Sequence, residues 1–331
     1  MNKTIIALLA IVLLVAMTGC SISVGTPTPQ PTQITLPSST PLPSTPTTGA
    51  PTPTLTPVTT TPGAPTPTTG SEPTSTTGGI IPGLPSGPYG VILVVPGDVL
   101  NIRTGPGAGY PVSGTFAATA TNVMRTGPSA TVPEGDLWAQ VQNPAGGSGW
   151  VNANYLTEYV LPATFCTDGR VNTLISNFGI SLETSNGGML APLVSPAHGM
   201  AVRLWRYSDP IIFDREHALW IFESTYEHDW GAAPASGLDT VGAFHLVVLP
   251  KLLDVFDAPP PGYISSCNVP QTGGASYDTS WPAIYTNINF YSLYKPGPAD
   301  NELSWRTLLI GIEYVQSQPY IYSVTQMDWE P

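Results

Sequence analysis

The sequence predicts a small all-β barrel and a C-terminal α+β domain, both placed after a disordered tether that is rich in proline and threonine. Three observations lead to this fold class. Residues 21–87 carry almost no charge and no hydrophobic period, and residues 88–160 hold short β-rich segments separated by turns. Residues 161–331 begin with a helical period and continue with strand-like segments, which is the pattern of an α+β domain.

Residues 1–20 have the pattern of an exported protein. Lys3 precedes an apolar run over residues 5–17, which is too short to span a bilayer permanently and is typical of a secretory signal. The run ends in the four residues MTGC at 17–20, which resemble the signal of bacterial lipoproteins, where small residues precede an invariant cysteine. The resemblance implies that Cys20 becomes the lipidated N-terminus. The alternative is an ordinary secretory signal in which Cys20 is incidental.

Residues 21–87 are expected to form a tether between this membrane anchor and the folded part. Thr, Pro, Ser and Gly dominate, and Glu72 is the single charged residue. Such a segment cannot bury enough apolar surface to offset the entropy of ordering it. Proline favours extended chain at about 3.1 Å per residue, so residues 21–79 of this tether reach at most ~180 Å. We therefore expect an extracytoplasmic protein on the cell membrane or cell surface.

Residues 88–160 are predicted to be all β. Strand-like segments lie at 91–95, 100–103, 121–124, 138–141 and 150–152. Turn clusters rich in Gly and Pro separate them, and no helical period is present, which predicts a small barrel.

The order of motifs in this segment resembles the bacterial SH3-like (SH3b) domain. The residues LNIRTGP at 100–106 are followed by Tyr110, by Trp138 before a strand, by GWV at 149–151 and by a closing Tyr-Leu at 155–156. The resemblance implies a groove that binds extended peptides, often those of the cell wall.

Four aromatic residues are the candidates to line this groove: Tyr110, Trp138, Trp150 and Tyr155. Aromatic rings suit this task because they offer large rigid faces that stack on proline or sugar. In so small a barrel the two tryptophans are expected mainly in the core, so the two tyrosines are the better surface candidates.

The C-terminal domain begins with a predicted helix. Asp168 is a suitable N-cap, and the helical spacing continues through Val171, Leu174, Ile175, Phe178 and Leu182. Strands are predicted over 199–205, 218–223, 243–249, 287–294 and 307–314. A turn at 316–319 predicts a hairpin between 307–314 and 320–327, whereas 251–256 is either a helical turn or a strand extension. The segment resembles a C-terminal region of other SH3b-bearing bacterial surface proteins of unassigned function.

The charged residues indicate no cofactor, metal ion or nucleic acid. The chain has 10 Lys and Arg against 22 Asp and Glu, a net charge of −12, so it cannot neutralise many phosphates. None of its four histidines has the spacing of a zinc protease, and no phosphate-binding loop is present. The clusters at 214–217 and 227–229 are interpreted as solvated loop charge.

The three cysteines have a simple interpretation. With Cys20 assigned to lipid, Cys166 and Cys267 remain as a pair, which is expected to form a disulfide in an oxidising compartment. The alternative is a nucleophilic Cys166 with His245 as its base, since SH3b modules are often joined to cell-wall peptidases. The residues around Cys166 lack the motif of those peptidases, so the disulfide is favoured.

These patterns predict a membrane-anchored lipoprotein without enzymatic activity that binds cell-wall peptide, glycan or a protein partner. The alternatives are a cell-wall hydrolase with its active site in the C-terminal domain and a structural spacer. Nine late aromatic residues are candidates for a carbohydrate groove or, more simply, for the core: Trp281, Tyr285, Phe290, Tyr291, Tyr294, Trp305, Tyr314, Tyr320 and Tyr322.

Membrane anchoring is tested by Cys20→Ser. Because the acyl chains are the expected source of membrane affinity, each buried CH₂ adding about 0.8 kcal/mol, the variant is expected to leave the membrane fraction or to stop before maturation. Fractionation of cells that express either form measures this. Unchanged partition of the variant would exclude the lipid anchor.

Overall fold

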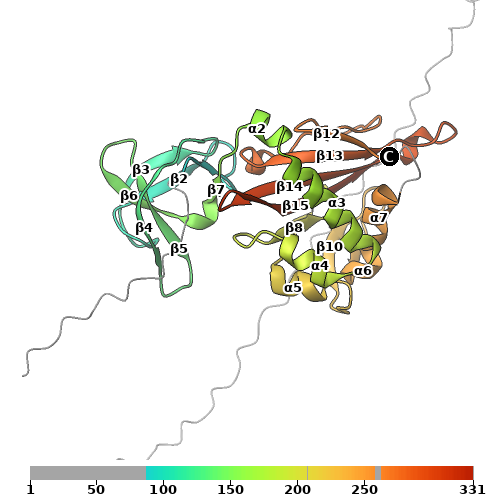
Figure 1. The fold of residues 1–331 in the computed structure, drawn as a ribbon, viewed down its shortest axis with the longest axis horizontal. Coiled ribbons are helices and arrows are strands. Elements are labelled where there is room, and N and C mark those ends of the chain that lie inside the picture. The colour runs from blue at the N-terminus through green and yellow to red at the C-terminus, as the bar shows by residue number, and fades with distance from the viewer. Residues whose placement is uncertain (1–86, 207, 258–261, 331) are drawn as a thin grey trace, which may run out of the picture. The chain divides into compact units, whose positions relative to one another are not determined.

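The computed structural model describes residues 87–206, 208–257 and 262–330, all of which belong to one compact unit (Figure 1). The signal segment with Cys20, and the tether up to residue 86, lie outside the described residues. We call residues 87–160 the N-terminal module and residues 161–330 the C-terminal module. Among the described residues no helix is both long and apolar enough to cross a membrane.

The N-terminal module consists of strands and one short 3-10 helix. Its elements are β1 (Tyr89–Val91), β2 (Val99–Arg103), β3 (Val112–Ala117), β4 (Arg125–Thr131), β5 (Leu137–Gln142), β6 (Ser148–Asn152), η1 (Ala153–Tyr155) and β7 (Leu156–Glu158). Five strands form a sheet in the order β3-β2-β6-β5-β4, and β1 pairs separately with β7. Alternate residues point inward, so Leu100 and Ile102 of β2 enter a core that contains Val141 and Val151.

This module differs from the sequence prediction in two places. Among the described residues no pairing joins the sheet edges β3 and β4, so the expected closed barrel is not found. The predicted strand at 91–95 ends at Val91, because Leu93 takes a positive φ of 61° and donates its N–H to the Ile284 carbonyl of the C-terminal module. The predicted strand at 121–124 contributes one β-bridge, between Val123 and Tyr89.

The C-terminal module combines a mixed sheet with helices. Its strands are β8 (Met200–Arg203), β9 (Ile211–Phe213), β10 (His228–Ala232), β11 (Asp239–Gly242), β12 (Ile264–Cys267), β13 (Asn289–Lys295), β14 (Arg306–Val315) and β15 (Gln318–Asp328). Its helices are α2 (Pro162–Cys166), α3 (Gly169–Glu183), α4 (Gly187–Leu190), α5 (Arg215–Trp220), α6 (Phe244–Val247) and α7 (Leu249–Phe256), with short 3-10 turns η2 (Ala191–Leu193), η3 (Ala283–Tyr285) and η4 (Glu302–Ser304). Six strands follow the order β12-β13-β14-β15-β8-β9, in which only β15 and β8 are parallel.

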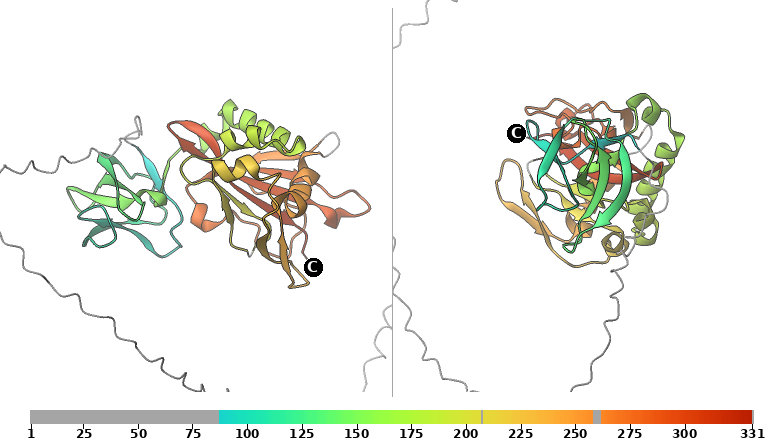
Figure 2. Two further views of the ribbon diagram at one scale, coloured as in Figure 1. Left: turned by 90° about the horizontal axis from the view of Figure 1, so that it is seen from below. Right: turned by 90° about the vertical axis from the view of Figure 1, so that its left-hand side faces the viewer.

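Strand β14 is the centre of this module, and its residues 307–314 are all buried. One face of the sheet packs against α3 and α7 in a core that includes Leu308, Ile310 and Val324 (Figures 1 and 2). The opposite face packs against the segment before β13, through Trp281 and Tyr285. The predicted helix and the predicted C-terminal hairpin are therefore both present, the helix with Asp168 as its N-cap.

Two predicted strands are helices in the structure. The segment 218–223 forms the last three residues of α5 and the turn after it, with Ala218 and Ile221 buried at helical spacing. The helix begins at this place because the Asp214 side chain accepts a hydrogen bond from the His217 N–H. The segment 243–249 contains α6 and the start of α7. Phe244 and Val248 are buried four residues apart there, a 3.6-residue period that a continuous apolar run conceals.

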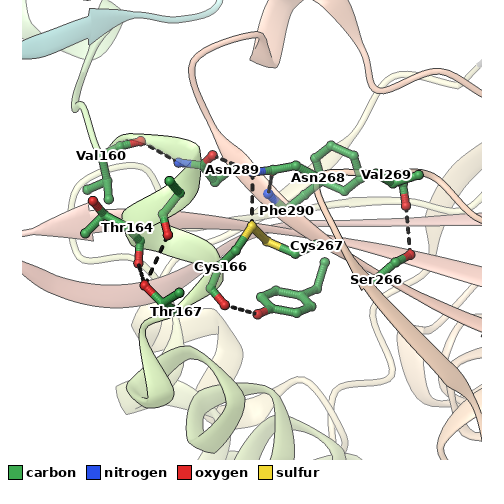
Figure 3. The surroundings of a disulfide bond; sticks show 12 residues. Val160, Thr164, Cys166, Thr167, Ser266, Cys267, Asn268, Val269, Asn289 and Phe290 are labelled. Atoms are coloured by element: carbon green, nitrogen blue, oxygen red, sulfur yellow. Dashed lines mark hydrogen bonds between the residues drawn. A yellow bond between two sulfur atoms is a disulfide. The ribbon is translucent and has the colours of Figure 1, made fainter.

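Cys166 at the end of α2 and Cys267 at the end of β12 form a disulfide, with their Cα atoms 5.7 Å apart (Figure 3). The side chains of Asn268 and Asn289 hold the surrounding loop. The side-chain amide of Asn268 donates to the side-chain oxygen of Asn289 at 2.9 Å. The Asn289 amide in turn donates to the Val160 carbonyl at 2.7 Å. The disulfide therefore connects α2, at the start of the helical layer, to β12, the edge strand of the sheet.

Loss of this disulfide is expected to destabilise the C-terminal module. The bond spans a sequence separation of 101 residues. A closed loop of this size lowers the entropy of the unfolded chain, which raises the free energy of unfolding by up to about 4–5 kcal/mol. Chemical denaturation of the wild type with and without reductant measures the loss, and the double variant Cys166→Ser/Cys267→Ser is the control that reductant should not change. A wild type insensitive to reductant would contradict the expectation.

Candidate functional site

The four aromatic residues predicted to line a peptide groove do not share a pocket. Trp138 is buried and Trp150 is half-buried within the five-stranded sheet, whereas Tyr110 and Tyr155 are exposed. The Tyr110 ring covers Gly105, where an added Cβ would lie 2.4 Å from the ring. None of the four lines the two pockets described below.

Most of the late aromatic residues are core residues. The buried ones are Tyr285, Phe290, Tyr291, Trp305, Tyr314 and Tyr322. Trp281 stacks on Phe290 with ring centroids 4.3 Å apart, and its indole N–H donates to the Tyr285 carbonyl. A carbohydrate groove on these residues is therefore not formed.

The charged clusters at 214–217 and 227–229 serve local structure. Asp214 caps α5 and also contacts the His217 ring at 2.7 Å, and both of these side chains are mostly exposed. Asp229 accepts a hydrogen bond from the Gly231 N–H. Within the described ranges, no group of three or more metal-ligating side chains is found.

A pocket of about 580 Å³ lies in the C-terminal module, between β9, α5, β10 and α6. We call it the aromatic pocket. Its lining residues are Ile212, Phe213, Glu216, His217, Trp220, Ile221, Ser224, Tyr226, His228 and Phe244. No element of the N-terminal module contributes to it.

The walls of the aromatic pocket expose an unusual amount of apolar surface. Trp220 is 56% exposed, Tyr226 is 68% exposed and Ile212 is 62% exposed, whereas Phe213 and Phe244 form a buried base. Large aromatic side chains normally bury most of their surface in a fold. Rings left this exposed around one cavity are available to a ligand.

His228 sits among these rings. It lies 4.8 Å from the Tyr226 ring and 5.3 Å from the Phe213 ring, centroid to centroid. Burial, followed by the positive charge of His217, lowers the pKa of His228 below its ordinary value. The imidazole is therefore neutral at pH 7, so it carries one hydrogen-bond donor and one acceptor.

The aromatic pocket thus combines flat apolar faces with a few polar groups. Glu216 supplies an acceptor, Ser224 a hydroxyl and His228 a neutral imidazole, and such a mixture orients a ligand through a small number of hydrogen bonds. Sequence reasoning did not find this site, because it placed Trp220 inside a predicted strand. The available signal was the grouping of Trp220 and Tyr226 with acidic and histidine residues within a dozen positions.

A second pocket of about 500 Å³, which we call the intermodular cleft, is lined by residues of both modules. On its C-terminal wall, the buried carboxylate of Glu313 accepts a hydrogen bond from the Ser195 hydroxyl at 2.5 Å and lies 2.6 Å from His198 Nδ1. Asn154 of the N-terminal module also lines the cleft, and its backbone contributes to raising the pKa of His198. Ser195 is bonded to the carboxylate and not to the imidazole, so this group does not form a nucleophile–base pair.

No family model, no curated protein and no solved structure matches this chain.

The His198–Glu313 pair is expected to make stability depend on pH. Burial alone would lower the pKa of His198, but the charge of Glu313 and the hydrogen bonds to Glu313 and Asn154 outweigh it and raise that pKa. A histidine whose pKa is raised on folding stabilises the protein fully below its unfolded pKa of about 6.5, and this contribution is lost as pH rises through the folded pKa.

The test compares the wild type with His198→Gln in denaturant titrations at pH 5.5 and pH 9. Breaking a buried charged pair costs roughly 3–5 kcal/mol, so the difference in unfolding free energy should approach that value at pH 5.5 and be smaller at pH 9. A difference that does not vary with pH would show that His198 is not charged in this pair.

Proposed function

We propose that the chain is a lipid-anchored extracytoplasmic protein that binds glycans through the aromatic pocket. The observation that supports this most directly is the exposure of Trp220 and Tyr226 around a cavity that also holds Glu216 and His228. The sequence also suggested that the chain binds a peptide or a protein partner. The four aromatic residues predicted to bind peptide do not line a comparable cavity.

A sugar fits this combination of groups. One face of a pyranose ring presents C–H groups, which stack on an aromatic face, and its rim presents hydroxyls, which need both donors and acceptors. The aromatic rings of the pocket supply the stacking faces, and Glu216, Ser224 and His228 supply the hydrogen-bond donors and acceptors. An anionic ligand fits poorly beside Glu216, which forms no salt bridge among the described residues.

The cellular location is supported by two independent features. The signal-like residues 1–20 end at Cys20, and the Cys166–Cys267 disulfide is a bond that persists in oxidising compartments outside the cytosol. Lipid on Cys20 and a tether over residues 21–87 would hold the folded part at a distance from the membrane.

We also propose that the N-terminal module is an SH3-like module. The order of its motifs from residue 100 to residue 156 supports this, and its sheet is built from short antiparallel strands. Tyr110 and Tyr155 remain its best surface candidates for peptide contact, because both are exposed.

The hydrolase alternative lacks support on the residues that suggested it. The sulfur of Cys166 is bonded to Cys267, so it is not available as a resting-state nucleophile. A binding role is therefore favoured.

Glycan binding is tested with tetrasaccharides of glucose and of N-acetylglucosamine, using tryptophan fluorescence and calorimetry on the purified protein. Each aromatic face contributes about 0.5–1.5 kcal/mol. Trp220→Ala or Tyr226→Ala should therefore weaken binding roughly two- to tenfold, and the double variant should weaken it further.

Trp329→Ala is the matched control. Trp329 is 38% exposed and lies outside the aromatic pocket, so its removal should leave affinity unchanged. Equal affinity of Trp220→Ala and Trp329→Ala for every bound sugar would exclude the aromatic pocket as the glycan site.

A further inference from the structure

The intermodular cleft contains two arginines that form no salt bridge with a described carboxylate. Arg125 comes from β4 of the N-terminal module, and Arg215 comes from the start of α5 in the C-terminal module. Neither forms a salt bridge with any described residue. The chain has only 10 Lys and Arg and a net charge of −12, so two arginines without a salt bridge in one cavity are a notable feature.

Neutral groups hold both guanidinium groups in place. Arg125 donates from Nη2 to the Ser129 hydroxyl at 2.8 Å. Arg215 donates from Nε to the Val194 carbonyl at 2.9 Å and stacks over the Tyr320 ring at 4.9 Å. These contacts fix the positions of the side chains without a salt bridge, and a guanidinium group held in this way can pair with an anion.

The carboxylates that line the cleft are already engaged. Glu313 is paired with Ser195 and His198. Glu158 accepts hydrogen bonds from the backbone N–H groups of Gln316 and Ser317 at 2.6 and 2.9 Å. Both acids therefore have other hydrogen-bond partners, and neither forms a salt bridge with the two arginines.

Arg125 also retains an unused donor. Its Nε is buried and has no hydrogen-bond partner in the structure. An unmet buried donor costs free energy, and a carboxylate bound to the same guanidinium edge would supply the missing acceptor.

The rest of the lining is largely apolar or aromatic and includes Leu137, Leu156, Val315 and Tyr320. A ligand with one negative charge and an apolar body matches such walls better than a multiply charged phosphate. We propose that the intermodular cleft binds a peptide through its free C-terminal carboxylate, with Arg125 and Arg215 as the anion-binding residues. This site is separate from the aromatic pocket, so it does not depend on glycan binding.

The test uses an equimolar mixture of N-acetylated tetrapeptides, supplied once as free acids and once as C-terminal amides. Affinity selection on the whole protein, read by mass spectrometry, should retain free acids and not the matching amides. Calorimetry with the retained peptides should then show at least tenfold weaker binding to Arg125→Gln and to Arg215→Gln. Arg103→Gln is the control, because Arg103 lies in the N-terminal module outside the cleft, and it should bind as the wild type does.

Arg125→Lys keeps the experiment decisive if a glutamine variant does not fold, because lysine preserves the charge but removes the planar fork, so the affinity should still fall. The proposal is overturned if acids and amides are retained equally, if no free acid is retained, or if folded arginine variants bind as the wild type does. Tetrasaccharide binding, measured on the same variants, should not change, so a failure of this site is distinguishable from a failure of the glycan site.

Discussion

Glu313 lies on the central strand of the C-terminal module with almost no exposed surface, and a carboxylate in that position is tolerated only if it is paired. It meets this requirement through Ser195 and His198, which lie in the segment just before β8. His198 lines the intermodular cleft together with Asn154 of the N-terminal module, so the partner that compensates the buried charge lies at the junction of the two modules. The pairing of one buried acid thus links the central sheet, the loop before β8 and the neighbouring module.

Further contacts join the two modules. The turn between β14 and β15 presents its backbone N–H groups at residues 316 and 317 to the Glu158 carboxylate. On the opposite face of the sheet, Asn287 donates to the Val91 and Ala120 carbonyls, and Ile92 packs with Tyr285 and Tyr322. Buried polar groups satisfied across a junction specify its geometry, because a shifted arrangement would leave them without partners. The intermodular cleft and its two arginines depend on that geometry.

The aromatic pocket has a different origin. Its base of Phe213 and Phe244 belongs to the core of the C-terminal module. Ring contacts with Phe213 and with the neighbouring core residue Trp230 position His228. Trp220 is the last residue of α5 and Tyr226 lies in the loop before β10, and both remain exposed among the described residues. The core therefore supplies a rigid floor, and the exposed rings supply contact area that the fold itself does not use. Binding sites are commonly built in this way, from exposed side chains that a rigid scaffold positions.

The sequence by itself determined the elements whose signals are local. Helix α3 could be predicted because its cap at Asp168 and its apolar period lie within one stretch of chain, and the β14–β15 hairpin could be predicted because a turn signal separates two strand-like segments. With only three cysteines, the partner of Cys166 could also be predicted. Tertiary structure decided the rest. Short apolar runs at 218–223 and 243–249 satisfy a strand and a helix equally well, and only packing against Phe213 and its neighbours selects the helix. Tertiary packing also leaves Trp220 exposed and Glu313 buried, and it brings Arg125 and Arg215 to one cavity from positions 90 residues apart. No local pattern encodes these outcomes, because each depends on contacts between distant segments.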